Sequence, residues 1–214
     1  MRKITDIYRD YNIMWQLQAH QLRVAAVAQQ ICQSLDIPVD THSIVSACLL
    51  HDMGNIIKFN LEYFPEFNQP QGIEYWRQIQ NEYIEKYGLN EHHATLEIAG
   101  ELGCTDSVKK IINAIDPLHL EKYGDQLSLE EKISLYADNR VTPHGIVSLK
   151  ERSEEAFHRY KNHRNALGLE SHKKFVGILE LCEKEIFSHS NIKPEDITDA
   201  SSMQIIELLK EFTL

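Results

Sequence analysis

Apolar residues recur at helical spacing along most of this 214-residue chain, and no stretch shows a sustained strand-type alternation. In the segment 12–35, for example, Leu17, Val24 and Ile31 share one face of the expected helix. Further helices are expected at 41–54, 73–87, 90–103, 106–115, 128–138, 147–187 (broken near 165–168) and 201–212. The sequence therefore predicts an all-α fold built as a single helical bundle.

Two segments interrupt the helical pattern. Residues 58–90 open with an aromatic stretch that contains Pro65 and Pro70, and this predicts an insertion or a lid. Residues 188–194 are polar and predict a linker. We therefore expect a bundle over 1–187, followed by the linker and a C-terminal helix over 188–214. That helix could pack on the bundle or on a second subunit of a homo-oligomer.

The charge balance and the cysteine spacing limit the partners and the compartment. The formal net charge is −10, from 22 Lys and Arg against 32 Asp and Glu, which disfavours duplex nucleic acid as a partner. No apolar run approaches the roughly 18 residues of a membrane span, and the N-terminus does not resemble a signal peptide. The four cysteines are far apart and predict free thiols. We expect a cytoplasmic protein without a membrane partner.

Four residues combine imidazole and carboxylate chemistry on the inward faces of different expected helices. They are His20, the adjacent pair His51 and Asp52, and Asp138. A buried carboxylate without a partner costs several kcal/mol, so each of these acids requires a cation or a metal beside it. Imidazole and carboxylate together suit divalent Fe, Mn, Zn, Ni or Mg. The sequence therefore predicts a metal site at the centre of the bundle.

The stretches around these residues resemble the HD-domain superfamily of metal-dependent phosphohydrolases. The matching motifs are HQLRVA at 20–25, LLHDMG at 49–54 and ISLYAD at 133–138, in that order on separate helices. The resemblance covers about residues 12 to 145 and implies an all-α bundle that hydrolyses a phosphate ester or anhydride. The bacterial HD-type dinucleoside tetraphosphate hydrolases are the most similar subgroup, apart from the longer segment at 58–90.

Additional histidines lie where dinuclear members of the superfamily place further ligands. His92 or His93 follows Asp52 by about 40 residues, and His119 precedes Asp138. The resemblance thus implies two divalent ions per chain, with Fe or Mn favoured and Zn, Ni or Mg also possible. The implied metal ligands are His20, His51, Asp52, His92 or His93, His119 and Asp138.

The implied substrate is a small phosphorylated molecule, most simply a nucleotide. Asp52 would bridge the two ions, and a water between them would attack phosphorus. Cationic side chains should contact the phosphate, and the candidates are Arg23, Arg140 and Lys58. Asn55 stands where many dinuclear phosphodiesterases of the superfamily carry Lys, and Lys58, about one turn later, could replace that Lys only if the helix continues. Arg23 and Arg140 could equally be partners in surface ion pairs.

Two other functions are compatible with the same residues. Some proteins with this fold use much the same ligands as a mixed-valent di-iron oxygenase, which redox-active iron and oxygen consumption would reveal. Others are non-catalytic sensor modules, which usually lose metal ligands. This chain keeps the full pattern, so hydrolysis is the preferred interpretation.

Overall fold

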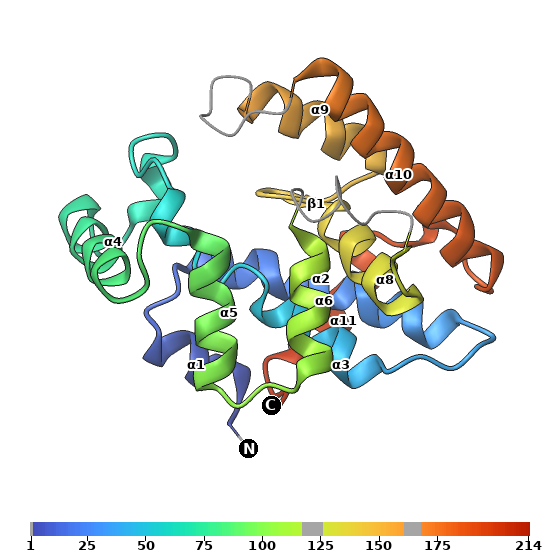
Figure 1. Cartoon of the computed structure of the whole chain (residues 1–214), viewed down its shortest axis with the longest axis horizontal. Coiled ribbons are helices and arrows are strands. Elements are labelled where there is room, and N and C mark those ends of the chain that lie inside the picture. The colour runs from blue at the N-terminus through green and yellow to red at the C-terminus, as the bar shows by residue number, and fades with distance from the viewer. Residues whose placement is uncertain (1, 117–125, 161–167) are drawn as a thin grey trace.

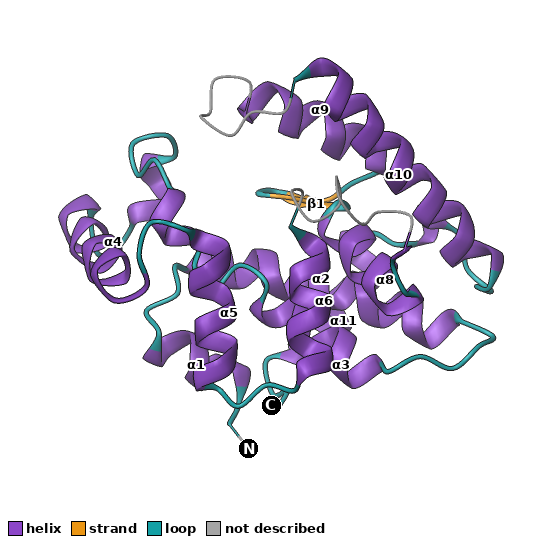
Figure 2. Ribbon diagram, viewed as in Figure 1, coloured by secondary structure: helices purple, strands orange, loops and turns teal. Residues whose placement is uncertain are grey.

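The computed structural model describes residues 2–116, 126–160 and 168–214, and these are folded almost entirely as helices (Figure 2). The α-helices are α1 (Ile4–Asp10), α2 (Trp15–Ser34), α3 (Thr41–Leu50), α4 (Ile73–Tyr87), α5 (Glu91–Glu101), α6 (Asp106–Ile115), α8 (Leu129–Asp138), α9 (Leu149–Tyr160), α10 (Leu169–Ser188) and α11 (Asp199–Leu209). Short 3₁₀-helices are η1 (Asn55–Lys58), η2 (Pro65–Asn68) and η4 (Pro194–Asp196). The all-α prediction is confirmed.

The one sheet that the structure describes is a two-stranded hairpin. β1 (Val141–Thr142) pairs antiparallel with β2 (Gly145–Ile146), directly after α8. No strand was expected here, because two residues per strand are too few to show an alternating pattern. Among the described helices, none combines the length and the hydropathy that a membrane span requires.

The centre of the bundle is formed by α2, α3, α6 and α8 (Figure 1). Helices α3 and α8 pack on each other, and each also packs on α2 and on α6. Their facing residues are fully buried and apolar, as with Val24, Ile44, Leu49 and Ile133. Around this centre, α10 packs on α8, α11 packs on α2, and α4 and α5 lie on the η1 side. Removal of this apolar surface from water is the main stabilising contribution to the bundle.

Side-chain caps fix where the central helices begin. Asp40 accepts a hydrogen bond from the Ser43 N–H at the start of α3, at 3.0 Å. Ser128 and Glu131 form a reciprocal capping box at the start of α8. Asn90 accepts from the backbone N–H of residue 93 at the start of α5. Caps of this kind satisfy N–H groups that the first helical turn leaves free.

The C-terminal segment packs on the bundle of its own chain. The Asp36 N–H donates to the carbonyl of His189 at 2.8 Å, and Gln30 Nε2 donates to Ser202 Oγ at 2.6 Å. The Ile4 N–H donates to the Phe212 carbonyl, so the two ends of the chain also meet (Figure 1). Of the two arrangements left open by the sequence, the structure shows the intramolecular one.

Helix α3 ends earlier than the expected range of 41–54, because the chain turns after His51 and approaches α5. The Gly54 N–H donates to Thr95 Oγ1 at 2.9 Å. A Cβ atom on Gly54 would lie 2.2 Å from the Glu91 carbonyl oxygen and 2.8 Å from Ala94 Cβ. Only glycine permits this close approach between the turn and α5.

We expect Gly54→Ala to lower the free energy of unfolding by about 1–3 kcal/mol, because overpacking forces the backbone of α5 away. Urea denaturation measures this change. Gly100→Ala is the matched control, since Gly100 lies in α5 and no neighbouring element of the described chain comes within 4 Å of where its Cβ atom would be. That control should be neutral or stabilising by up to about 1 kcal/mol. Equal effects at the two glycines would contradict the close approach.

Candidate metal centre

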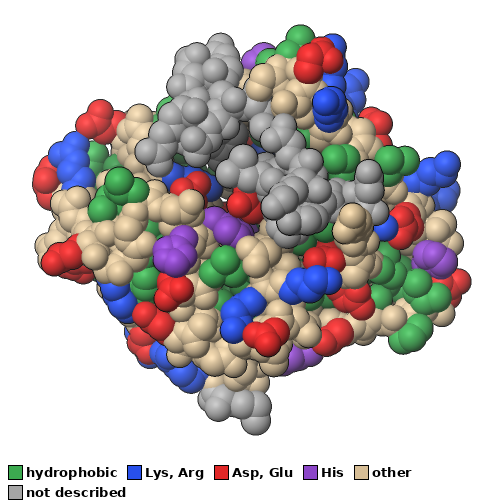
Figure 3. All heavy atoms as spheres, in the orientation of Figure 1, with side chains coloured by type: hydrophobic (Ala, Val, Ile, Leu, Met, Phe, Trp, Pro, Cys, Tyr) green, Lys and Arg blue, Asp and Glu red, His purple; other side chains and the backbone are tan. Residues whose placement is uncertain are grey.

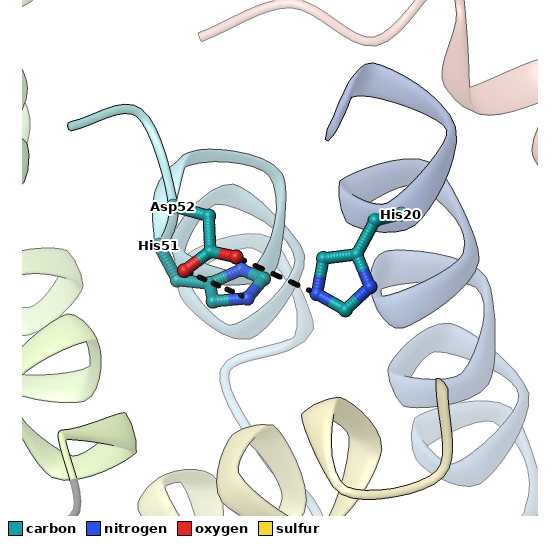
Figure 4. A group of neighbouring side chains, drawn as sticks. All are labelled: His20, His51 and Asp52. Carbon is teal, nitrogen blue, oxygen red and sulfur yellow. Dashed lines mark ion pairs between the residues drawn. The ribbon is translucent and has the colours of Figure 1, made fainter. Parts of the chain in front are cut away.

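Side chains from α2 and from the end of α3 converge inside the bundle (Figure 4). One donor atom each of His20, His51 and Asp52 lies within 4.8 Å of the other two. His20 Nε2 is 3.6 Å from Asp52 Oδ2, and His51 Nε2 is 3.6 Å from Asp52 Oδ1. The Asp52 carboxylate thus lies between two imidazoles, a donor set that suits a divalent ion.

Asp138, the last residue of α8, lies beside the same two imidazoles. Its Oδ1 is 3.1 Å from His20 Nε2 and 3.3 Å from His51 Nε2. Three helices therefore bring together the four residues that the sequence singled out. On the face shown in Figure 3, His side chains lie next to acidic ones near the middle.

Contacts behind the site orient its side chains. His51 Nδ1 donates to the Cys48 carbonyl at 2.8 Å, which turns Nε2 toward the carboxylates. The buried Gln21 accepts from the Asp52 backbone N–H at 3.3 Å. Such outer contacts fix the tautomer and the orientation of metal ligands. Gln21 was not singled out from the sequence, although its place on the inward face beside His20 was a visible signal.

The electrostatics of the site call for a cation. The His51 side chain is only 2% exposed, and its Nε2 has no well-aligned hydrogen-bond partner within the described part of the chain. Burial lowers the pKa of His51, but the Asp52 and Asp138 carboxylates raise it by more, to about 9. Burial raises the pKa of Asp138, whereas His20 and His51 hold it well below its usual range. A divalent ion would neutralise both carboxylates and accept both imidazole lone pairs.

The family model for the HD domain matches residues 17–141, which is more than half of the chain and spans all three motifs. The chain belongs to the HD-domain family. Proteins of this family are generally metal-dependent hydrolases. Comparisons with curated proteins and with solved structures found no match. The similarity to dinucleoside tetraphosphate hydrolases therefore stays a prediction.

The additional histidines of this HD domain are placed differently from one another. His92 is half-buried in the first turn of α5, and its Nε2 is 2.9 Å from Asn113 Oδ1 on α6. His93 is exposed. His119 lies outside the described residues. Of the adjacent pair, His92 is thus the one that is turned toward the protein interior.

Arg140 of the HD domain is used to hold the fold together. This arginine is 3% exposed, and its Nε donates to the Val147 carbonyl. One terminal nitrogen donates to the Tyr136 hydroxyl, and the other donates to the carbonyls of Pro194 and Ile197, each at 3.1 Å. With its donors directed at these oxygens, Arg140 does not fit the expected contact with a phosphate.

The two other expected cations keep partial exposure. Arg23 Nε lies 3.6 Å from Asp199 Oδ1 at the start of α11. Lys58 Nζ lies 3.6 Å from Glu91 Oε1, at the end of η1. Each side chain is about one quarter exposed, which leaves it accessible to a ligand.

We expect Arg140→Met to lower the free energy of unfolding by about 2–4 kcal/mol, because it leaves three carbonyl groups without their donor. Urea denaturation measures the loss. Arg77→Met is the matched control, since Arg77 forms only surface ion pairs with Glu62 and Glu74 and should cost less than about 1 kcal/mol. A stable Arg140→Met protein would show that the buried contacts are unimportant.

We expect Asp52→Asn to lower the affinity for a divalent metal by at least about tenfold, because it removes one ligand charge between the two imidazoles. Elemental analysis of protein purified without chelator, followed by titration of the metal-free form, measures this. Asp36→Asn is the control, since that carboxylate is 73% exposed and lies just after Ser34, at the opposite end of α2 from His20. Full metal content in Asp52→Asn would exclude Asp52 as a ligand.

Proposed function

We propose that this HD-domain chain is a metal-dependent phosphohydrolase that cleaves a phosphate ester or anhydride in a small nucleotide, with dinucleoside tetraphosphates among the candidate substrates. The observation that supports this proposal is the group of His20, His51 and Asp52, completed by Asp138, in which His51 is buried and the other side chains are at most 20% exposed. Carboxylates and imidazoles enclosed in this way bind a hard or borderline divalent ion.

Four residues of the chain would bind the ion, and one of them would also orient the other ligands. His20, His51, Asp52 and Asp138 would hold it. Asp52 directs Oδ1 toward His51 and Oδ2 toward His20, so one carboxylate positions both rings. A bound divalent ion lowers the pKa of its water and neutralises charge on the phosphoryl oxygens.

A second ion would require His92 and His119, with Asp52 shared between the two ions. The position of His92 supports its part of this proposal. If His92 Nε2–H donates to Asn113 Oδ1, the lone pair of Nδ1 is left for a metal. We propose His92 rather than His93 as the ligand on this ground.

Lys58 and Arg23 are the proposed phosphate contacts. Lys58 ends η1, which directly follows the His51–Asp52 turn, and Arg23 lies one helical turn beyond His20. Each now faces a carboxylate 3.6 Å away, so a more highly charged phosphate could attract it from that partner. The bound metal would offset the net negative charge of the chain inside the site.

We expect the metal-loaded protein to release phosphate or nucleotide from one class in a panel of diadenosine tetraphosphate, nucleoside monophosphates, cyclic nucleotides and guanosine tetraphosphate. Asp138→Asn should lower kcat/KM by roughly 100-fold or more, since loss of the metal removes several kcal/mol of transition-state stabilisation. Chelation should abolish turnover, and added metal should restore it.

Asp36→Asn serves again as the control and should retain full activity. Two redox-active irons with oxygen consumption and no phosphate release would overturn the proposal in favour of oxygenase chemistry. Purified protein with neither metal nor turnover would indicate a binding module.

A further inference from the structure

Five aromatic side chains from three segments form a connected row, which we call the aromatic rim. Trp15 begins α2, Tyr63, Phe64 and Phe67 lie at or near η2, and His144 lies in the turn between β1 and β2. The ring centroids of neighbours are 5.8 Å apart for Trp15 and Phe67 and 4.8 Å apart for Phe67 and Phe64. From Phe64 the row reaches Tyr63 at 4.6 Å and His144 at 6.2 Å.

Each part of the aromatic rim is close in sequence to a part of the chain that supplies the metal centre. Trp15 precedes His20 in α2 by five residues. The β1–β2 turn follows Asp138 closely, and the segment that includes η2 follows Asp52 through η1. Figure 1 places that segment and the hairpin on the same side of the bundle. The rim is therefore a candidate contact surface for the part of a substrate that extends from the metal centre.

Packing alone does not account for the two outer members of the rim. Trp15 is 52% exposed and Tyr63 is 55% exposed, whereas the other tryptophan, Trp76, is 4% exposed in the core. Phe64 and Phe67 are half-buried, and their rings contact those of Tyr63 and Trp15, respectively. An exposed aromatic ring that is held by an edge-to-face contact offers a face on which a nucleobase can stack.

A polar group adjoins the rim on the side of the metal centre. Gln16 lies four residues before His20, hence on the same face of α2. Its Nε2 donates to the Phe67 carbonyl at 3.4 Å, whereas its Oε1 is buried without a hydrogen-bond partner among the described residues. A buried acceptor without a donor is unfavourable, so a ligand N–H or O–H would satisfy it.

We propose that the aromatic rim and Gln16 form the nucleoside subsite of this enzyme. The base stacks on Tyr63, Gln16 accepts a hydrogen bond from the base or the ribose, and the phosphate reaches the metal centre. This inference rests on the proposed function, because the metal centre holds the phosphate end. It makes a nucleoside phosphate, rather than a sugar phosphate, the substrate class.

Comparative binding of AMP and ribose 5-phosphate to the metal-loaded protein tests the subsite, because the two ligands differ only in the base. We expect AMP to bind at least about tenfold more tightly by calorimetry. Tyr63→Ala should weaken AMP binding by roughly 5- to 100-fold, as for loss of one stacking platform, and leave ribose 5-phosphate unchanged. Tyr63→Phe, which keeps the ring, should retain AMP affinity.

Gln16→Ala should likewise weaken AMP and spare ribose 5-phosphate if its acceptor contacts the base. Tyr75→Ala is the control, since Tyr75 is an exposed aromatic residue outside the rim. AMP should also quench the fluorescence of the exposed Trp15, and Trp15→Phe should abolish that signal without abolishing binding.

The outcomes separate this inference from the proposed function. Equal affinity for AMP and ribose 5-phosphate, or full AMP affinity in Tyr63→Ala, would overturn the subsite even if phosphate is released from either ligand. A base-dependent, Tyr63-dependent affinity without turnover of any nucleotide in the panel would support the subsite and overturn the hydrolase. Failure of both ligands to bind would overturn the subsite, and turnover of the nucleotide panel would then decide the proposed function alone.

Discussion

Two imidazoles and two carboxylates meet where the ends of α3 and α8 face α2, and this arrangement of charge governs the rest of the structure. His51 Nε2 faces the oxygens of Asp52 and Asp138 in a buried position. Lone pairs that face one another repel unless a proton or a metal lies between them, and the raised pKa of His51 reflects the proton. The neighbouring helices hold these groups at the spacing that a shared proton or metal requires.

The restraints that do so are local and specific. The Cys48 carbonyl fixes the His51 ring, and Gln21 fixes the Asp52 backbone. The turn after Asp52 is held against α5 through Gly54 and Thr95. The restraints combine a local hydrogen bond at the end of α3 with bonds to α2 and α5. The positions of the site residues therefore depend on the packing of these three helices and not on their own flexibility.

The sequence predicted the helices and the central group well, because both leave periodic or short-range signals. His20, His51, Asp52 and Asp138 were expected together, since each ends or lies on an inward apolar face, and the structure places them together. Arg140 was misjudged because its partners are backbone carbonyls at residues 147, 194 and 197, which no side-chain pattern announces. Helix α1 and the β1–β2 hairpin were missed because they are too short to establish a period.

The contacts of Arg140 extend the folded unit beyond the residues that match the family model. The family match ends at residue 141, yet this arginine binds carbonyls of η4 and its flank from a position two residues after Asp138. The backbone at Pro194 and Ile197 thereby fixes the residues that directly follow α8, the helix that ends with Asp138. The folded unit is consequently larger than the region that matches the family model. A fragment trimmed to residues 17–141 would carry this guanidinium beside the candidate metal centre with three of its four acceptors gone.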